Sequence, residues 1–294
     1  THLKSKALVA AGRDFILRVR LPDSATALHD AGIGLAALAN NHTMDYGERG
    51  ISETMERLRD AGVLYAGAGA NRAEAEKVRI MEVKGFSIGF LSFSDVVPRG
   101  YGAEEAWPGI ASAKDVTRLT AAIERARPKV DVLVVILHWG LELARMPSRR
   151  QMELARLSHD AGADVIVGAH PHVLQPVGCA GMTPVVYSAG DFVFPSGREL
   201  AQRSAIFEVE VQRQEGKSAA RVRAVRIIPT AMSSEGRARL AEPELAAGIL
   251  HEMKVGAERL GARLDSDTVT CTVLPVHYWQ DSASFPRRPT KKAS

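Results

Sequence analysis

Cysteine is scarce in this chain of 294 residues, which has only Cys179 and Cys271. The two are 92 positions apart and lie outside any CxxC pattern, so the spacing supports neither a zinc knuckle nor a disulfide framework. The redox compartment therefore stays open. Long apolar runs are also absent: "VLVVIL" at 132–137 is far shorter than the roughly 18 residues that a membrane span needs.

Aromatic residues and a charge excess of one sign are lacking as well. Aromatics make up 5% of the chain, and 38 basic residues against 34 acidic ones give a net charge of +4. Basic residues gather only in "RRPTKK" at 287–292, so we expect no nucleic-acid partner. An anionic small molecule or polymer fits the charge equally well. Apolar residues at 46% and charged residues at 24% are typical of a soluble folded protein.

The chain begins "THLKSK", without a basic-then-apolar signal segment. The compartment is therefore undetermined. A cytoplasmic location and attachment to a membrane through a missing N-terminus are both compatible with the sequence.

Helical patterns alternate with short apolar runs through the first two thirds of the chain. Asp-Ala-Gly closes three of the helical stretches, with Gly32, Gly62 and Gly162 suited to the left-handed position after a helix. Helical spacing of apolar residues predicts helices around 51–58 and 116–123. Strands rich in Val, Ile and Leu without polar alternation are covered on both faces, so the pattern predicts an α/β layered fold with central β-strands flanked by helices.

From residue 205 the pattern changes. "AIFEVEVQ" and "RVRAVRII" alternate apolar and polar residues, as half-exposed strands of a hairpin or sheet edge do. A last helix is predicted at about 243–260. We expect one domain over residues 1–265 and a C-terminal extension with a loose polar tail over 266–294.

Histidines follow three of the apolar runs. "IGLAALA" leads into Asn40, Asn41 and His42, "VLVVIL" into His138, and "DVIVGA" into "HPH" at 170–172. Loops at the carboxyl ends of strands line the ligand crevice of open α/β sheets, so these side chains can converge. Proline at 171 favours extended backbone before it, and extended residues two apart point the same way, which would present His170 and His172 together.

Each of these features has a simpler explanation when taken alone. A His-x-His pair is more often a solvated loop, a histidine at a strand end is usually structural, and Asn-Asn is common in turns. Their combination favours a metal site. Imidazole with amide or carboxylate oxygen suits zinc, iron, nickel or manganese.

With these motifs the chain resembles the poly-γ-glutamate capsule synthesis (CapA-type) proteins of the calcineurin-like metallophosphoesterase superfamily. The resemblance rests on "LANNHTMDYGERG", "GAGAN", "LHWGLE", "GADVIVGAHPHVLQP" and "VVYSAGDFVF", and spans residues 25–230. It implies a metallophosphoesterase-like layered fold that holds one or two divalent ions, manganese, zinc or iron.

The resemblance also implies roles for individual residues. Asn41, His138 and His170 would hold one metal, His172 would serve the second, and His42 would donate a proton. Asn40, Glu142 and Asp191 would contact the substrate or the metal ligands, although the family usually has asparagine at the position of Asp191. The family's opening carboxylate block has no match between Thr1 and Asn40, so we expect this N-terminal block to be missing.

Two functions follow as hypotheses. The first is a metal-dependent hydrolase or transferase of bacterial capsule or poly-γ-glutamate metabolism, which acts on a phosphate ester or an amide, although the missing block could leave this chain inactive. The alternative is a non-catalytic subunit that binds polymer within a capsule synthesis or export assembly. Under either hypothesis, membrane-associated capsule synthase proteins are expected as partners.

Overall fold

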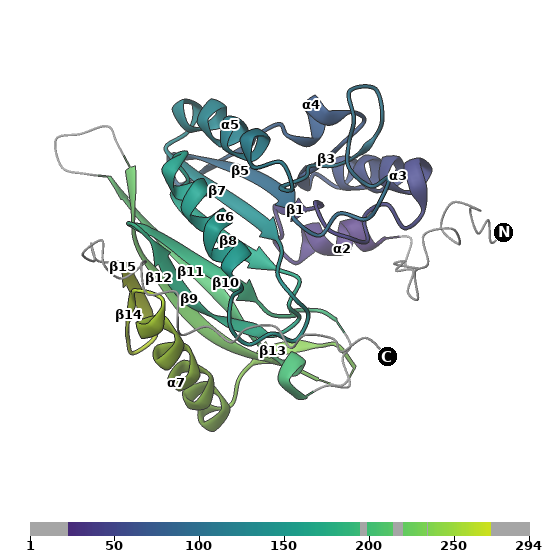
Figure 1. The fold of residues 1–294 in the computed structure, drawn as a ribbon. Helices are drawn as coiled ribbons and strands as arrows, with labels where there is room; N and C mark the ends of the chain where they lie inside the picture. The colour runs from purple at the N-terminus through teal and green to yellow at the C-terminus, as the bar shows by residue number, and fades with distance from the viewer. Residues whose placement is uncertain (1–22, 195–198, 214–219, 234, 272–294) are drawn as a thin grey trace, which may run out of the picture.

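A computed structural model of the chain describes residues 23–194, 199–213, 220–233 and 235–271. Its centre is a six-stranded sheet (Figure 1). The strand order is β4 (Arg79–Val83), β5 (Phe86–Ser94), β7 (Val132–His138), β8 (Val165–Ala169), β10 (Thr183–Ala189) and β9 (Leu174–Ala180). The four inner strands are parallel, and each edge strand is antiparallel to its neighbour.

Helices α5 (Val116–Ala126) and α6 (Arg149–Asp160) cover one face of this sheet. Leu119 and Ile123 of α5 and Leu154 of α6 are fully buried there against Leu133 and Ile166 of the inner strands. Because the inner strands are covered on both faces, they read in the sequence as unbroken apolar runs. The predicted α/β class, with central strands flanked by helices, is confirmed.

A second sheet packs on the other face. It contains β11 (Arg203–Arg213), β12 (Ala220–Met232), β15 (Thr268–Cys271) and β14 (Ala262–Asp265) in that order, and β13 (Ala238–Leu240) pairs with β12. Strands β11 and β12 form the predicted hairpin, and α7 (Pro243–Arg259) is the predicted last helix. The sheet extends to Cys271, past the boundary at residue 265 that was drawn from the sequence.

The smaller elements lie beside the carboxyl ends of the inner strands. Helices α2 (Ser24–Asp30), α3 (Gly47–Asp60) and α4 (Arg72–Ala75) lie in this region together with two short sheets (Figure 1). These sheets are β1 (Leu35–Ala37) with β2 (Leu64–Ala66), and β3 (Ala68–Gly69) with β6 (Gly109–Ile110). Two 3₁₀ turns, Arg127–Lys129 and Glu199–Gln202, complete the described elements. The run after α2 therefore forms a short strand paired with β2, and not a strand of the central sheet.

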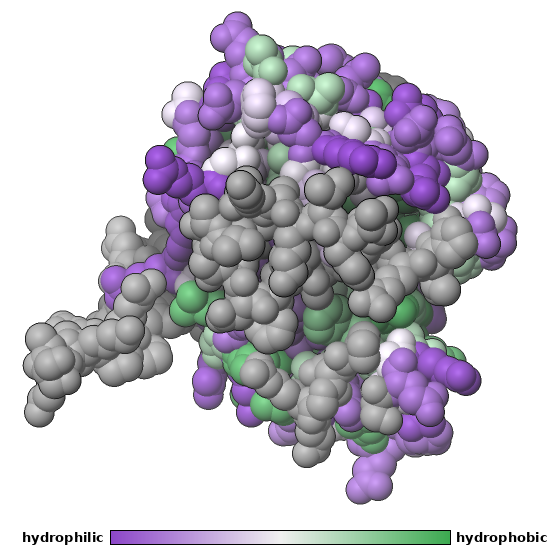
Figure 2. Space-filling view, turned by 90° about the vertical axis from the view of Figure 1, so that its right-hand side faces the viewer, coloured by the Kyte–Doolittle hydropathy of each residue, from purple (hydrophilic) through white to green (hydrophobic). Residues whose placement is uncertain are grey.

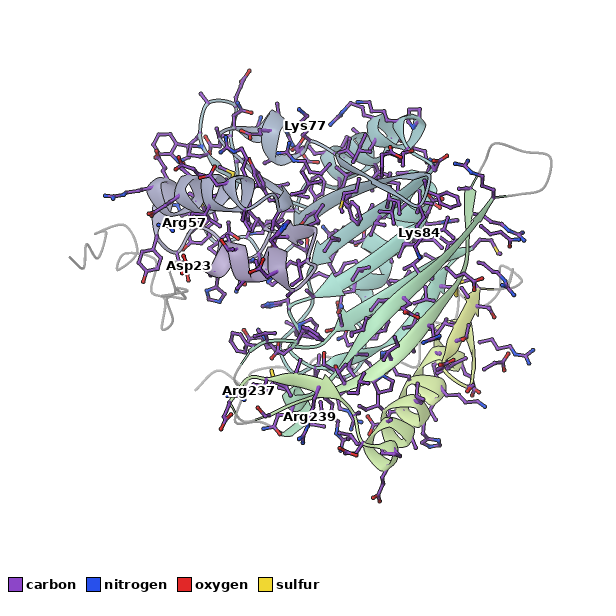
Figure 3. The ribbon with its side chains drawn as sticks, turned by 180° about the vertical axis from the view of Figure 1, so that it is seen from behind. Asp23, Arg57, Lys77, Lys84, Arg237 and Arg239 are labelled. Carbon is purple, nitrogen blue, oxygen red and sulfur yellow. A yellow bond between two sulfur atoms is a disulfide. The ribbon has the colours of Figure 1, made fainter. Side chains whose placement is uncertain are left out.

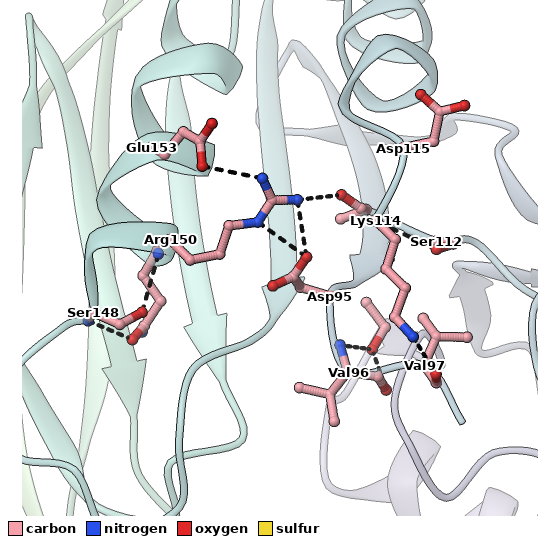
Figure 4. Close-up of polar contacts among 12 residues, drawn as sticks. Asp95, Val96, Val97, Ser112, Lys114, Asp115, Ser148, Arg150 and Glu153 are labelled. Carbon is pink, nitrogen blue, oxygen red and sulfur yellow. Dashed lines mark hydrogen bonds and ion pairs between the residues drawn. The ribbon is translucent and has the colours of Figure 1, made fainter. Parts of the chain in front are cut away.

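Helix ends follow the sequence signals. Gly32, Gly62 and Gly162 have the predicted positive φ angles, at 77°, 74° and 109°. At the start of α6, Ser148 and Gln151 form a capping box, and Arg150 pairs with Asp95 at 3.1 Å (Figure 4). This ion pair fastens the start of α6 to the chain just after β5.

A disulfide bond joins Cys179 of β9 to Cys271 of β15. It crosses between the two sheets, and Cys179 is 3% exposed. The sequence spacing gave no reason to pair these cysteines, because strands far apart in the chain bring them together.

Charged side chains are distributed over the surface. Figure 3 labels Lys84 near one end of the β11–β12 hairpin and Arg237 and Arg239 near the other. Figure 2 shows mainly hydrophilic side chains over the upper part of the face that it draws, with hydrophobic ones in its lower half. Among the described residues, no helix has both the length and the apolar character needed to cross a membrane. Of the span between Thr1 and Asn40, where the family's opening carboxylate block has no match, residues 1–22 lie outside the described residues, as does the predicted polar tail beyond Cys271.

Candidate metal centre

The chain segments that carry the predicted site residues meet at the carboxyl ends of β7 and β8. The two strands are parallel neighbours, with His138 opposite Ala169. His170 follows Ala169, so the rings of His138 and His170 lie 4.6 Å apart between centroids. The predicted convergence of these two imidazoles follows directly from strand register.

The Asn-Asn-His segment after β1 closes the other side. Together these segments form a pocket of about 290 Å³, lined by Ala37, Ala39, Asn40, Asn41, His42, Ser92, Ile136, His138, Ala169 and His172. Five of the predicted site residues therefore face one cavity: Asn40, Asn41, His42, His138 and His172. Ser92 of β5 also lines it and was not singled out in the sequence, because a serine inside an apolar strand gives no signal of its own.

Asn41 and His138 contact each other directly. The Nε2 atom of His138 lies 2.9 Å from Oδ1 of Asn41, and as N–H it donates to that oxygen. Burial, together with the nearby imidazoles of His170, His172 and His42, lowers the pKa of His138 to about 3. The ring is therefore neutral at neutral pH, which is the form that binds a metal.

Glu142, His170 and His172 form a second group. One possible ligand atom from each residue lies within 4.8 Å of the others. Burial lowers the pKa of His170, and the negative charge of Glu142 partly offsets that effect. The resemblance placed Glu142 in contact with the substrate or the metal ligands. In the structure, its carboxylate lies where it could itself ligate a metal ion.

Two buried polar atoms of this region have no hydrogen-bond partner among the described residues, Nδ1 of His170 and Oδ2 of Asp191. Buried polar atoms are nearly always paired, so such orphans point to an absent ligand. The other oxygen of Asp191 lies 2.8 Å from Nδ1 of His172. A carboxylate in this position fixes the ring and leaves Nε2 for a cation, as is common in metal sites. The residues present therefore fit a divalent metal.

His42 sits in a separate hydrogen-bonded chain. Its Nδ1 lies 2.8 Å from Oδ2 of Asp45, and Asp45 is 1% exposed. The hydroxyl of Tyr101 donates to the other oxygen of Asp45 at 3.1 Å. Oδ1 of Asn40 accepts the backbone N–H of His42 at 2.8 Å, so Asn40 shapes the turn. The support from Tyr101 crosses 56 residues and has no signal in the sequence, whereas Asp45 lies only three positions after His42.

The predicted extended backbone at the His-Pro-His segment is wrong. His170 has a φ of 99° and His172 a φ of 59°. Proline disfavours right-handed helical backbone in the residue before it, but a positive φ satisfies that restriction as well. Such angles in non-glycine residues cost about 1 to 3 kcal/mol each and concentrate at functional sites. The two rings are therefore brought together by a strained turn.

The comparisons with known proteins agree with this set of motifs. Residues 6–196 match the family model described as bacterial capsule synthesis protein PGA_cap. The chain belongs to this family. The PGA biosynthesis protein CapA of Bacillus subtilis is 36% identical over 192 residues, which cover 65% of this chain and 50% of that protein. A probable polyglutamine synthesis accessory protein of Mycobacterium tuberculosis is 29% identical over 183 residues, covering 58% and 48%.

The chain thus spans about half the length of these two relatives. Solved structures similar to it include the Thermus thermophilus sulfate thiohydrolase SoxB, at 16% identity and a TM-score of 0.46 over 78% of this chain and 38% of that one. Haemophilus influenzae NAD nucleotidase has 16% identity and a TM-score of 0.37, covering 74% and 36%. Scores this low support no argument about this chain.

Proposed function

We propose that this chain is a metal-dependent hydrolase or transferase domain of bacterial capsule or poly-γ-glutamate metabolism, which acts on a phosphate ester or an amide. The observation that carries the proposal is the meeting of Glu142, His170 and His172 beside the Asn41–His138 pair. The names of the relatives support the capsule context.

In this proposal Asn41, His138, Glu142, His170 and His172 hold one or two divalent cations, manganese, zinc or iron. A bound divalent cation polarises the bond under attack and makes a water molecule more acidic. Imidazole and carboxylate ligands suit these metals.

His42 donates a proton to the leaving group from Nε2, while its Nδ1 stays bonded to Asp45. The carboxylate of Asp45 is itself held by Tyr101, so the ring keeps one orientation towards the pocket. A general acid placed in this way typically contributes about 10² to 10⁴ in rate. Asp191 orients His172 in the same manner.

The ligand class we propose is an anionic small molecule or a polymer similar to poly-γ-glutamate, within an assembly that includes membrane-associated capsule synthase proteins. No acidic side chain lies among the described residues that line the pocket. That lining offers no opposite charge to an organic cation as substrate. It also favours the second candidate, a non-catalytic polymer-binding subunit, because it supplies no carboxylate to bridge two cations.

Metal binding and turnover, measured on the same preparations, separate the two candidates. After dialysis against Mn²⁺ or Zn²⁺, His170→Ala should lose metal. His42→Ala should keep its metal and lose about 10²- to 10⁴-fold in hydrolysis of a model phosphodiester or γ-glutamyl amide. His251→Ala is the matched control, since His251 is exposed on α7 and outside the pocket.

Metal-loaded chain with no hydrolysis above the His42→Ala level would support the polymer-binding candidate. Equal loss of metal in His42→Ala and His170→Ala would show that His42 is a ligand and reverse its role.

A further inference from the structure

Backbone strain is concentrated around the metal centre. Five non-glycine residues among those described have a positive φ: Lys84, Leu143, His170, His172 and Ser266. Lys84 and Ser266 lie in the turns of the β4–β5 and β14–β15 hairpins, where such angles are common. The other three lie on two loops, residues 140–146 and residues 170–172, which carry the ligand group.

These two loops contact each other. The backbone N–H of Leu143 donates to the carbonyl oxygen of Pro171 at 2.7 Å. Glu142, Leu143 and Arg145 are exposed, so burial of side chains on the first loop does not explain its conformation. Polar contacts with neighbouring residues therefore hold loop 140–146 in place.

Gln175 supplies these contacts. Its Nε2 donates to the carbonyl oxygens of Ala144 and Met146, at 2.8 and 3.1 Å. The side chain is 0% exposed and follows the histidine loop by three residues. The side-chain amide of Gln175 thus links the loop that carries Glu142 to the strand that follows His172.

A second buried glutamine completes the arrangement. Nε2 of Gln151 donates to Oε1 of Gln175 at 2.8 Å, and Oε1 of Gln151 accepts from the backbone N–H of Ser148 at 2.9 Å. Gly140, with a φ of 85°, packs against this amide, because a Cβ atom there would lie 2.6 Å from Oε1 of Gln151. Both ends of loop 140–146 therefore rest on the two glutamines.

We propose that Gln175, supported by Gln151, is a positioning residue that locks loop 140–146 against loop 170–172 and so presents Glu142 to His170 and His172. The inference rests on the proposed function, because it takes these three residues as metal ligands. An apolar side chain in the same space would leave the carbonyls of Ala144 and Met146 without donors. The loop would then relax, and each binding event would have to order it.

Mn²⁺ affinity, measured by titration calorimetry on the full chain, tests this proposal. Gln175→Met removes the amide at similar length. Gln175→Glu keeps an acceptor for Gln151, but it replaces the two N–H donors to the loop with an oxygen and adds a buried carboxyl group. Both variants should bind Mn²⁺ at least 10-fold more weakly than the natural chain, with circular dichroism confirming that the samples are folded.

Thr183→Val is the matched control. Thr183 is 4% exposed and donates to the carbonyl oxygen of Ala163 at 2.7 Å, at the opposite end of the parallel strands from the metal centre. The Thr183→Val variant also loses a buried hydrogen bond, so it shows how far general destabilisation of the fold lowers Mn²⁺ affinity. Its Mn²⁺ affinity should stay within 2-fold of the natural chain.

Unchanged affinity in the Gln175 variants would overturn the positioning role, as would an equal loss in Thr183→Val. If neither Gln175 variant folds, Gln151→Glu is measured instead. It keeps the acceptor for Ser148 and loses the donor to Gln175, and the same two outcomes decide. A natural chain that binds neither Mn²⁺ nor Zn²⁺ would refute the proposed metal centre and this inference with it, whereas metal binding that is insensitive to Gln175 refutes the inference alone.

Discussion

Reduction of the Cys179–Cys271 bond should lower the stability of the chain severely. The bond closes a loop of 92 residues, and the chain-entropy relation for a loop of this length gives about 4 to 5 kcal/mol at 25 °C. Domains of ordinary stability unfold at a cost of about 5 to 15 kcal/mol, so the loss would be a large share of the total.

Urea unfolding followed by far-ultraviolet circular dichroism, with and without a reductant, measures this loss. Reduction is a clean perturbation, because the chain has two cysteines and both belong to this bond. Thiol counting in denaturant supplies the control: oxidised chain should give no reactive thiol and reduced chain two. The double variant Cys179→Ala, Cys271→Ala should match the reduced chain within the cost of the altered packing.

Equal free energies of unfolding for the oxidised and reduced chains would refute the reasoning. So would two reactive thiols in chain prepared under oxidising conditions. Disulfides of this kind form in oxidising compartments. The oxidised, more stable form should therefore accumulate when the chain is produced in a bacterial periplasm.

Three further outcomes are expected. Gly256→Ala should lower the free energy of unfolding by about 1 to 3 kcal/mol, because the new Cβ would lie 2.0 Å from Cγ of Pro176. Gly248→Ala on the same helix meets nothing within 4 Å and should raise it by up to about 1 kcal/mol. Urea unfolding of both variants measures the two changes. The pKa of the Asp131 carboxyl lies below the ordinary value of 3.8, chiefly because the backbone N–H of Ser87 donates to it. The ionised carboxylate therefore stabilises the folded chain above pH 3.8, and this stabilisation is lost as the pH falls through the folded-state pKa. Asp131→Asn should accordingly flatten the fall of the thermal midpoint below pH 4, and an unchanged acid profile would contradict that cause.

The sequence predicted those parts of the structure that depend on local pattern and strand order. Unbroken apolar runs marked the inner strands, and parallel neighbours bring His138 and His170 together without further information. The glycine after each Asp-Ala also ended its helix as predicted.

Features that depend on tertiary packing were missed or wrong. The disulfide and the support of Asp45 by Tyr101 join segments whose distance in the fold no spacing rule gives. The backbone of the His-Pro-His segment was predicted as extended because proline limits its predecessor, but the segment forms a positive-φ turn in which the carbonyl oxygen of Pro171 accepts from the backbone N–H of Leu143.

The proposed metal centre requires that Glu142, His170 and His172 hold a divalent cation. Anomalous diffraction from crystals grown with Mn²⁺ or Zn²⁺ tests it most directly, because the anomalous signal locates the ion independently of any assumed chemistry. We expect an anomalous peak within coordination distance, about 2.0 to 2.2 Å, of one atom from each of the three residues. An ordered metal centre with no peak between them, or with the ion bound elsewhere on the chain, would contradict it.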